Sequence, residues 1–242
     1  KINNLVETEM LIEKQRAIKD NEEIKYIKKA CNITDDCFEY LLNYIKIGMT
    51  EKQIATAIER FFRINGANDL AFDTIVASGE NSSKPHAVPS NRKIQEHDII
   101  TIDMGCKVNG YCSDMTRTFF VGEPTEEMKR VYDLVLNNQE FALDQYKEGA
   151  STRQVTKMVE NDFKLNGYDL IHSLGHGVGL EIHEPPYVGI RNDTNLRENM
   201  VVTDEPGIYI PGKFGVRIED TVQITKFGCV SLTNSEKGYV II

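Results

Sequence analysis

The chain has 242 residues, of which 40% are apolar and 27% charged, and these proportions are typical of a globular protein with one large domain or two small ones. Its net charge of -9 and pI near 5.2 argue against nucleic acid or an anionic membrane as the main partner. No apolar run approaches the roughly 20 residues of a membrane span. The five cysteines form no Cys-x-x-Cys pair, so we expect reduced thiols and a cytoplasmic location.

The first part of the chain predicts helices followed by short strands. Residues 9–46 indicate two helices broken near Asn32–Asp35. A third helix begins at the capping box Thr50-Glu-Lys-Gln53 and should end near Asn65-Gly66. Short strands are expected after it, in FDTIVASG and DIITID, and Asn109-Gly110 then predicts a hairpin turn.

The second part repeats this order of helices and then strands. Pro124-Thr125 begins a long helix that runs to about Lys147, and the capping box Ser151-Thr-Arg-Gln154 begins another that ends at Asn166-Gly167. The remainder is strand-like, in DLIHSL, GLEIH, MVVTD, GIYI, GVRIEDTVQIT, GCVSLT and GYVII. Helices mixed with antiparallel strands predict an α+β fold.

Four carboxylates and one imidazole stand in informative local contexts in the last 140 or so residues. They are Asp103 in TIDMG, Asp114 in YCSDMTRT, His176 in SLGHGVG, Glu205 in TDEPG and Glu219 in VRIED. Such an oxygen-rich set suits two divalent cations that share carboxylates, and it suits Mn²⁺ or Co²⁺ at least as well as Zn²⁺. The sequence therefore predicts a hydrolase with two metal ions.

The hairpin at Asn109-Gly110 brings two of these carboxylates together. Counting outward from the turn, Asp103 faces Thr116 and Gly105 faces Asp114. Side chains alternate along a strand, so both aspartates lie on one face, with about 7–8 Å between their α-carbons. Two surface aspartates near a turn are the alternative, but the apolar run before Asp103 implies burial, which is costly for an unpaired carboxylate.

A second acidic hairpin echoes the first. Glu205-Pro-Gly is followed by Glu219, as Asp103-Met-Gly is followed by Asp114, so two hairpins could face each other across a pseudo-twofold axis. Coincidence is an equally open explanation. Arg217 lies two residues before Glu219 on the same strand face, where its guanidinium could hold a ligand carboxylate in place or form an ordinary cross-strand salt bridge.

The histidines are ambiguous when each is taken alone. His176 and His183 are separated by a glycine-rich segment that disfavours a helix, so they do not form the helical zinc motif. Either could be a hydrogen-bonded core residue instead. His86 lies in a Lys-Pro-His-Ala-Val-Pro loop, where a surface position is the default, and His172 lies four residues before His176.

Together these motifs resemble the metallopeptidases of the pita-bread fold, which include methionine aminopeptidase, aminopeptidase P and prolidase. The resemblance runs from about Leu11 to Ile242, and all five ligand positions occur in the family's order. PHAVP, SDMTRTF, His172 and Arg217-Ile-Glu219-Asp are similar to the aminopeptidase P and prolidase branch. The fold that this implies is a pseudo-twofold antiparallel sheet covered by helices.

The resemblance also implies roles for the residues. Asp103 would bind one metal ion, His176 and Glu205 the other, and Asp114 and Glu219 would bridge the pair. His86 and His183 would contact the substrate carbonyl and stabilise the developing oxyanion. His172 would line the substrate pocket. A metal-bridging hydroxide would attack the peptide bond, and Glu205 would take the proton from the bridging water and deliver it to the leaving proline nitrogen.

The activity implied first is that of an Xaa-Pro aminopeptidase with two divalent metal ions, expected to be Mn²⁺, with Co²⁺ or Zn²⁺ as alternatives. Prolidase, which cuts Xaa-Pro dipeptides, is the alternative. Methionine aminopeptidase is disfavoured by the context of Arg217, and a non-catalytic binding module would lose metal ligands that are intact here. We also expect residues 1–10 to be a linker from an N-terminal domain, residues 11–242 to be the catalytic domain, and the full-length protein to be a homodimer.

Overall fold

The computed structural model describes residues 7–191 and 193–242, so most of the predicted linker at residues 1–10 lies outside the described residues. The helices are α1 (Leu11–Ala17), α2 (Asn21–Tyr44), α3 (Glu51–Ile64), α4 (Glu126–Gln145) and α5 (Thr152–Leu165), with a 3-10 helix, η1 (Gly79–Ser83). Among the described residues, no helix is long and apolar enough to cross a membrane.

The strands form four small antiparallel sheets. In the first half these are β2 (Ile75–Ser78), β3 (Ile99–Met104) and β6 (Met115–Phe120), in the order β2-β3-β6, with β1 (Asp69–Leu70), β4 (Cys106–Val108) and β5 (Tyr111–Cys112) in a second sheet. The second half holds the order β13-β12-β9-β7-β8, built from β7 (Gly175–Gly177), β8 (Glu184–Val188), β9 (Val201–Asp204), β12 (Asp220–Ile224) and β13 (Cys229–Ser231). β10 (Gly207–Ile210) and β11 (Phe214–Arg217) form a separate two-stranded hairpin in the same half.

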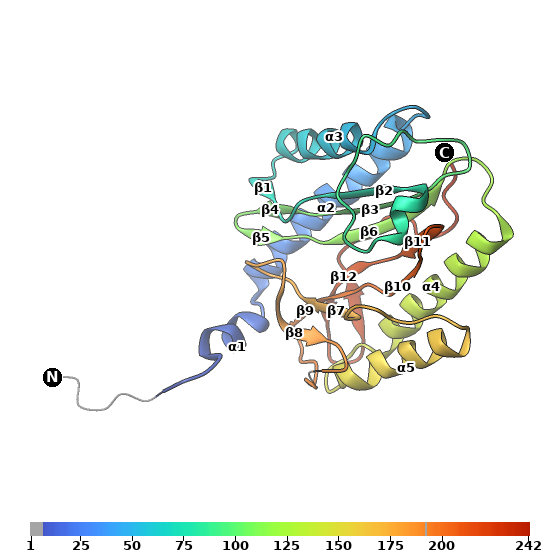
Figure 1. Cartoon of the computed structure of the whole chain (residues 1–242). Coiled ribbons are helices and arrows are strands. Elements are labelled where there is room, and N and C mark those ends of the chain that lie inside the picture. The colour runs from blue at the N-terminus through green and yellow to red at the C-terminus, as the bar shows by residue number, and fades with distance from the viewer. Residues whose placement is uncertain (1–6, 192) are drawn as a thin grey trace.

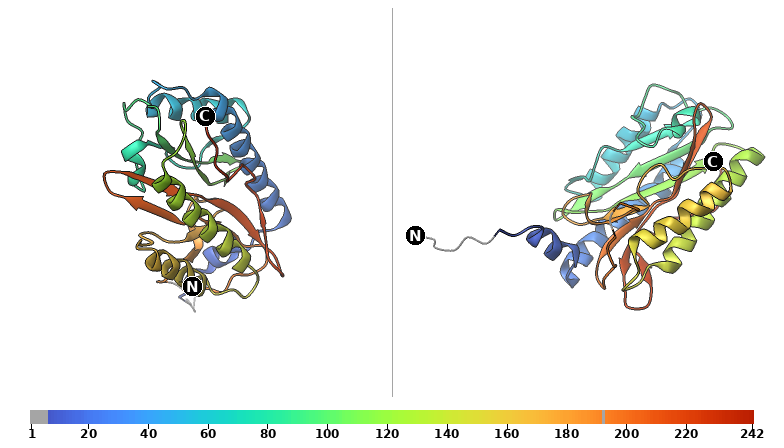
Figure 2. Two further views of the ribbon diagram at one scale, coloured as in Figure 1. Left: turned by 90° about the vertical axis from the view of Figure 1, so that its right-hand side faces the viewer. Right: turned by 60° about the horizontal axis from the view of Figure 1, so that its bottom comes forward.

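Each half pairs two helices with its own strands. Figure 1 shows α2 and α3 beside the upper strands and α4 and α5 beside the lower ones, and Figure 2 shows the strands between the two helix pairs. One apolar core joins α2 and α3 to β2, β3 and β6, and another joins α4 and α5 to β8 through β12. The α+β fold with pseudo-twofold character, predicted from the sequence, is confirmed.

The capping residues explain where the helices begin. Thr50 and Ser151 accept hydrogen bonds from the backbone amides three residues later, and Thr125 does the same for α4. The predicted break near Asn32–Asp35 is wrong, because α2 is continuous there. The break lies instead before Asp20, whose carboxylate accepts from the amides of the first turn of α2.

Three predicted strands are absent from the described residues. GYVII forms only an isolated bridge between Ile241 and Phe120. The segments DLIHSL and GLEIH are irregular, and β7 and β8 begin only after them, at Gly175 and Glu184. Tertiary contacts outweigh the local apolar pattern here, because the chain between His176 and His183 folds around a buried carboxylate that is described below. The hairpin turn is as predicted, with positive φ at Asn109 and Gly110 and with Val108 paired to Tyr111.

Candidate metal centre

The five predicted ligands come from strand ends in both halves of the fold. Asp103 is on β3, Asp114 precedes β6, His176 is on β7, Glu205 follows β9, and Glu219 lies between β11 and β12. All five line one cavity of about 350 Å³. The same cavity is lined by the other residues predicted to act there, namely His86, His172, His183 and Arg217. The fold therefore brings together every predicted site residue, while their individual roles stay predictions.

Three of the ligands form a compact group. Atoms of Asp114, His176 and Glu219 that can bind a metal lie within 4.8 Å of one another, and all three side chains are buried. His176 Nε2 lies 3.4 Å from Asp114 Oδ2 and also 3.4 Å from Glu205 Oε1. Among the described residues, the buried Oδ1 of Asp103 has no hydrogen-bond partner. This orphaned oxygen and the crowded carboxylates fit a donor set for divalent cations.

The charges of the site are not balanced by the protein. Burial raises the pKa of Asp114 and Glu219 well above the ordinary values, and neighbouring carboxylates raise both further. Burial also raises the pKa of Asp103, against which the guanidinium of Arg217 acts. Asp103, Asp114 and Glu219 share one nearby guanidinium, and repulsion among the clustered carboxylates opposes their ionisation together. Bound cations would remove that repulsion, so the residues present fit the divalent metals of the predicted site.

Arg217 fixes two ligand carboxylates. Its side chain is buried and donates from Nη2 to Asp103 Oδ2 at 2.7 Å and from Nε to Thr116 Oγ1 at 3.1 Å. The Thr116 hydroxyl donates in turn to Glu219 Oε2 at 2.6 Å. Arg217 thus contacts one predicted ligand directly and another through a hydroxyl, so an exposed salt bridge is excluded, and its role in supporting metal ligands stays a prediction.

Tyr209 links Arg217 to His172 and was not predicted. Arg217 Nη1 donates to the Tyr209 hydroxyl at 2.7 Å, and that hydroxyl lies 3.0 Å from His172 Nε2. His172 Nδ1 lies 2.8 Å from the carbonyl oxygen of Ser173, so Nδ1 donates and Nε2 accepts from Tyr209. Burial lowers the pKa of His172, which keeps the ring neutral. The only sequence signal for Tyr209 as a site residue was its position in the predicted strand GIYI.

The rings of His176 and His183 lie against each other, with centroids 4.2 Å apart. His176 Nδ1 lies 3.1 Å from the carbonyl oxygen of Gly177, and donation there leaves Nε2 free to bind a metal ion. Burial lowers the pKa of His183, and the neighbouring His176 lowers it further. A neutral His183 at the mouth of the cavity can donate one N–H to a substrate oxygen.

The loop that carries His86 is held by a buried carboxylate that the sequence did not single out. Glu51 accepts hydrogen bonds from the amide and hydroxyl of Ser78, both at 2.7 Å, and from those of Ser90 at 2.9 and 2.6 Å. Asn81 donates to it as well. Glu51 thereby pins both ends of the 78–90 segment. The only local sign of Glu51 was its position in the first turn of a predicted helix.

Comparison with known proteins identifies the family of the chain. The model of metallopeptidase family M24 matches residues 25–226. The chain is 44% identical over 229 residues to the Xaa-Pro dipeptidase of Pyrococcus furiosus, covering 94% of this chain and 66% of that relative. It therefore spans about two thirds of the length of the curated relatives that it matches.

Solved structures show the same relationship. The X-Pro aminopeptidase of Thermotoga maritima is 42% identical with a TM-score of 0.93, over 96% of this chain and 66% of that one. The prolidase of Pyrococcus furiosus is 45% identical with a TM-score of 0.91, over 93% of this chain and 68% of that one. The chain belongs to metallopeptidase family M24, the pita-bread family of hydrolases that depend on divalent metals.

Proposed function

We propose that residues 11–242 form the catalytic domain of an Xaa-Pro dipeptidase, an enzyme that hydrolyses dipeptides with proline in the second position. The buried group of Asp114, His176 and Glu219 carries this proposal, because it stands in a cavity that three further histidines line. The names of the relatives favour dipeptidase over the aminopeptidase that the sequence predicted first. A homodimer of the full-length protein and a cytoplasmic location stay predictions.

The residues of the site divide the work of hydrolysis. Asp103, Asp114, His176, Glu205 and Glu219 would hold two divalent cations, which supply Lewis acidity and a water whose pKa is lowered to about 7. A water oxygen would add to the carbonyl carbon, and the peptide C–N bond would break when the carbonyl re-forms and the proline nitrogen leaves. Glu205 would hold the proton lost by that water at its carboxylate and deliver it to the leaving proline nitrogen.

The histidines would act on the substrate. N–H groups of His183 and His86 would donate to the carbonyl oxygen as negative charge develops there, an interaction that strengthens in the transition state. His172, held neutral and oriented by Tyr209, would pack beside the proline ring. Arg217 keeps Asp103 and Glu219 in place while these steps occur.

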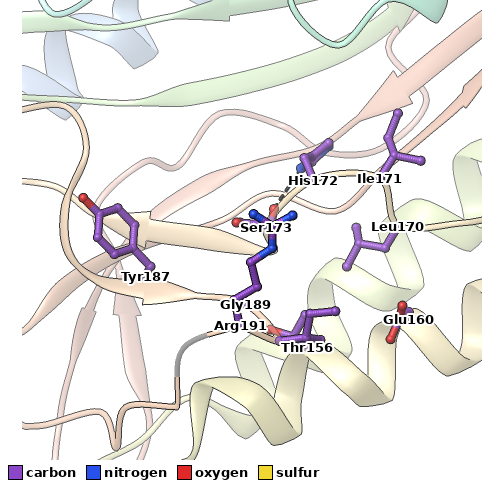
Figure 3. A pocket seen from close by; sticks show the side chains of 10 residues that line it. Thr156, Glu160, Leu170, Ile171, His172, Ser173, Tyr187, Gly189 and Arg191 are labelled. Atoms are coloured by element: carbon purple, nitrogen blue, oxygen red, sulfur yellow. Dashed lines mark hydrogen bonds between the residues drawn. The ribbon is translucent and has the colours of Figure 1, made fainter.

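A second cavity next to the metal cavity supports Xaa-Pro aminopeptidase activity as the second candidate function. This cavity of about 660 Å³ shares His172, Ser173 and Tyr187 with the metal cavity and continues to Arg191. Figure 3 shows the Arg191 side chain extending toward Ser173. Its guanidinium has no hydrogen bond or ion pair with the described residues, so residues after proline could extend toward it.

The test is hydrolysis of Ala-Pro against Ala-Pro-Ala with Mn²⁺ and with a chelator. Cleavage of the dipeptide alone, abolished by chelator, is the expected result. Cleavage of the tripeptide at a comparable rate would replace the dipeptidase with the aminopeptidase, and Arg191→Gln should then raise KM for the tripeptide only. Failure to cut either peptide with two metal ions bound would overturn both.

A further inference from the structure

A buried carboxylate directly follows His183 and is held by the N-terminal segment. Glu184 is 2% exposed at the start of β8. Its Oε1 accepts from Lys19 Nζ at 2.9 Å, and its Oε2 accepts from Arg16 Nη2 at 2.5 Å. Lys19 is also only 2% exposed. Figure 1 shows α1, which carries Arg16 at its end, close to β8.

The glycine-rich segment between His176 and His183 is shaped around that carboxylate. A Cβ at Gly179 would stand 2.4 Å from Glu184 Oε1, and one at Gly177 would stand 2.5 Å from the carbonyl oxygen of Glu184. Only glycine leaves room at these positions for the chain to fold back so closely. The path of the segment between the two histidines therefore depends on where the Glu184 side chain is held.

The ion pairs with Lys19 and Arg16 keep the Glu184 carboxylate in its buried position. A buried carboxylate is costly unless a cation pairs with it, and removal of one partner leaves a charge that must move toward water. Burial lowers the pKa of Lys19, while the charge of Glu184 acts to raise it, so the two depend on each other. Arg16 is partly exposed and lies 3.5 Å from the exposed Glu181 as well, so it cannot replace Lys19.

The backbone of the N-terminal segment is anchored without this ion pair. The Lys19 amide donates to the carbonyl oxygen of Asn199 at 3.0 Å, and Ile18 forms an antiparallel bridge with Met200. Ala17 belongs to the core of the second half. Loss of the Lys19 charge should therefore leave the segment docked and release the Glu184 side chain.

We propose that Lys19, with Arg16, is a positioning residue that sets the His183 ring over the site through Glu184. The kinetic test of this inference rests on the proposed peptidase activity. If Glu184 turns toward solvent, His183 moves with it, and so does the adjacent ring of His176. The N-terminal segment would then control the geometry of the site from a contact 165 residues away in sequence.

The test compares Lys19→Met with Lys14→Met, which removes an exposed lysine from α1. We expect Lys19→Met to lower kcat for Ala-Pro by about 10- to 100-fold, with a smaller change in KM and with two metal ions retained. Lys14→Met should match the parent. The double variant Lys19→Met/Glu184→Gln removes the stranded charge and should recover much of the lost kcat, which a simple loss of packing would not.

A second readout does not depend on activity. The chain has five histidines, and their ring resonances can be followed by NMR in the metal-free protein. In Lys19→Met the His176 and His183 signals should shift while that of the distant His97 stays. If the parent has no peptidase activity, the proposed function is wrong. The shifts of the His176 and His183 ring signals in Lys19→Met would still test whether Lys19 positions these rings.

Two outcomes would overturn the inference. One is a Lys19→Met variant with parental kcat and unmoved His176 and His183 signals. The other is a loss of kcat that the double variant does not relieve. If Lys19→Met does not fold, Arg16→Met is measured in its place. Because the Arg16 side chain is partly exposed, we expect a smaller loss of kcat and smaller shifts of the His176 and His183 signals. Parental kcat and ring signals there would equally overturn it.

Discussion

Asp114 and Glu219 are the residues whose charge most depends on a bound cation. They are 4% and 1% exposed, and burial together with neighbouring carboxylates raises the pKa of each well above its ordinary value. His176 supplies the imidazole nitrogen of their group. Their roles as bridging ligands can be tested separately from those of the histidines that would touch substrate.

Asp114→Asn keeps the shape of the side chain and removes its charge. Because a bridging carboxylate serves both cations, we expect this variant to lose high-affinity binding of both ions and to fall to background activity. Metal content after dialysis and hydrolysis of Ala-Pro measure the two effects, with the exposed Asp36→Asn as control. Retained activity with two bound ions would show that Asp114 is no bridging ligand.

His183→Ala should separate catalysis from metal binding. We expect kcat to fall about 100-fold, the loss typical of one oxyanion donor, while metal content stays at the parental value. His97→Asn is a suitable control, because His97 is exposed with φ of 63°, a conformation that asparagine tolerates. A variant that instead loses a metal ion would make His183 a ligand.

For single residues, the sequence predicts those positions that are set by local spacing along the chain. Asp103 and Asp114 could be placed on one face because an Asn-Gly turn and the period of a strand set their register, and Asp103 does pair with Thr116. Tyr209, Glu51 and Glu184 could not be identified. Their partners come from other parts of the chain, and no local pattern records such contacts.

At the scale of elements, buried carboxylates hold the loops that carry the site. Glu51 pins the segment with His86, and Glu184 pins the segment with His183. The predicted helices α3, α4 and α5 are correct because their caps are local, whereas the break in α2 was misplaced. Thr34 in that helix donates to the carbonyl oxygen of Ala30 and contacts Ser113, so its polar side chain does not end the helix.

Glu51→Gln should weaken the His86 loop in a pH-dependent way. Burial acts to raise the pKa of Glu51, but hydrogen bonds from Ser90 and Ser78 outweigh it and the pKa is lowered. The folded state therefore binds that proton less tightly than the unfolded state does. The stability that Glu51 contributes is present above the unfolded pKa of about 4.3 and is lost as pH falls through the folded value.

We expect Glu51→Gln to lower the free energy of unfolding by about 1–3 kcal/mol at pH 7. Its stability should also decline less steeply than that of the parent as pH falls below about 4.3. Denaturant unfolding at several pH values measures both effects, with Glu59→Gln on the exposed side of α3 as control. Parallel pH profiles for parent and variant would contradict the role of Glu51.

At the scale of the whole molecule, the site joins the two halves of the fold. Asp103 and Asp114 come from the first half, and His176, Glu205 and Glu219 from the second. The two acidic hairpins noticed in the sequence do face one cavity. Cations bound there would cross-link the halves, so metal binding should contribute to global stability as well as to catalysis.

The stability gained from metal should increase with pH. Carboxyls with a raised pKa bind protons more tightly in the metal-free folded state, so its stability should fall as pH rises above the unfolded value of about 4. Metal binding needs the same groups deprotonated. We expect Mn²⁺ at hundredfold excess over its Kd to add about 2.7 kcal/mol for each ion bound. The difference in Tm between Mn²⁺ and chelator should be larger at pH 8 than at pH 5, and an equal or reversed difference would contradict this electrostatic account.

The most direct test of the central claim is a titration of Mn²⁺ into metal-free protein, with bound metal and hydrolysis of Ala-Pro measured at each step. We expect two ions to bind per chain, and activity to appear with them and disappear with chelator. Full activity in the presence of chelator, or two bound ions without hydrolysis of any Xaa-Pro peptide, would contradict it.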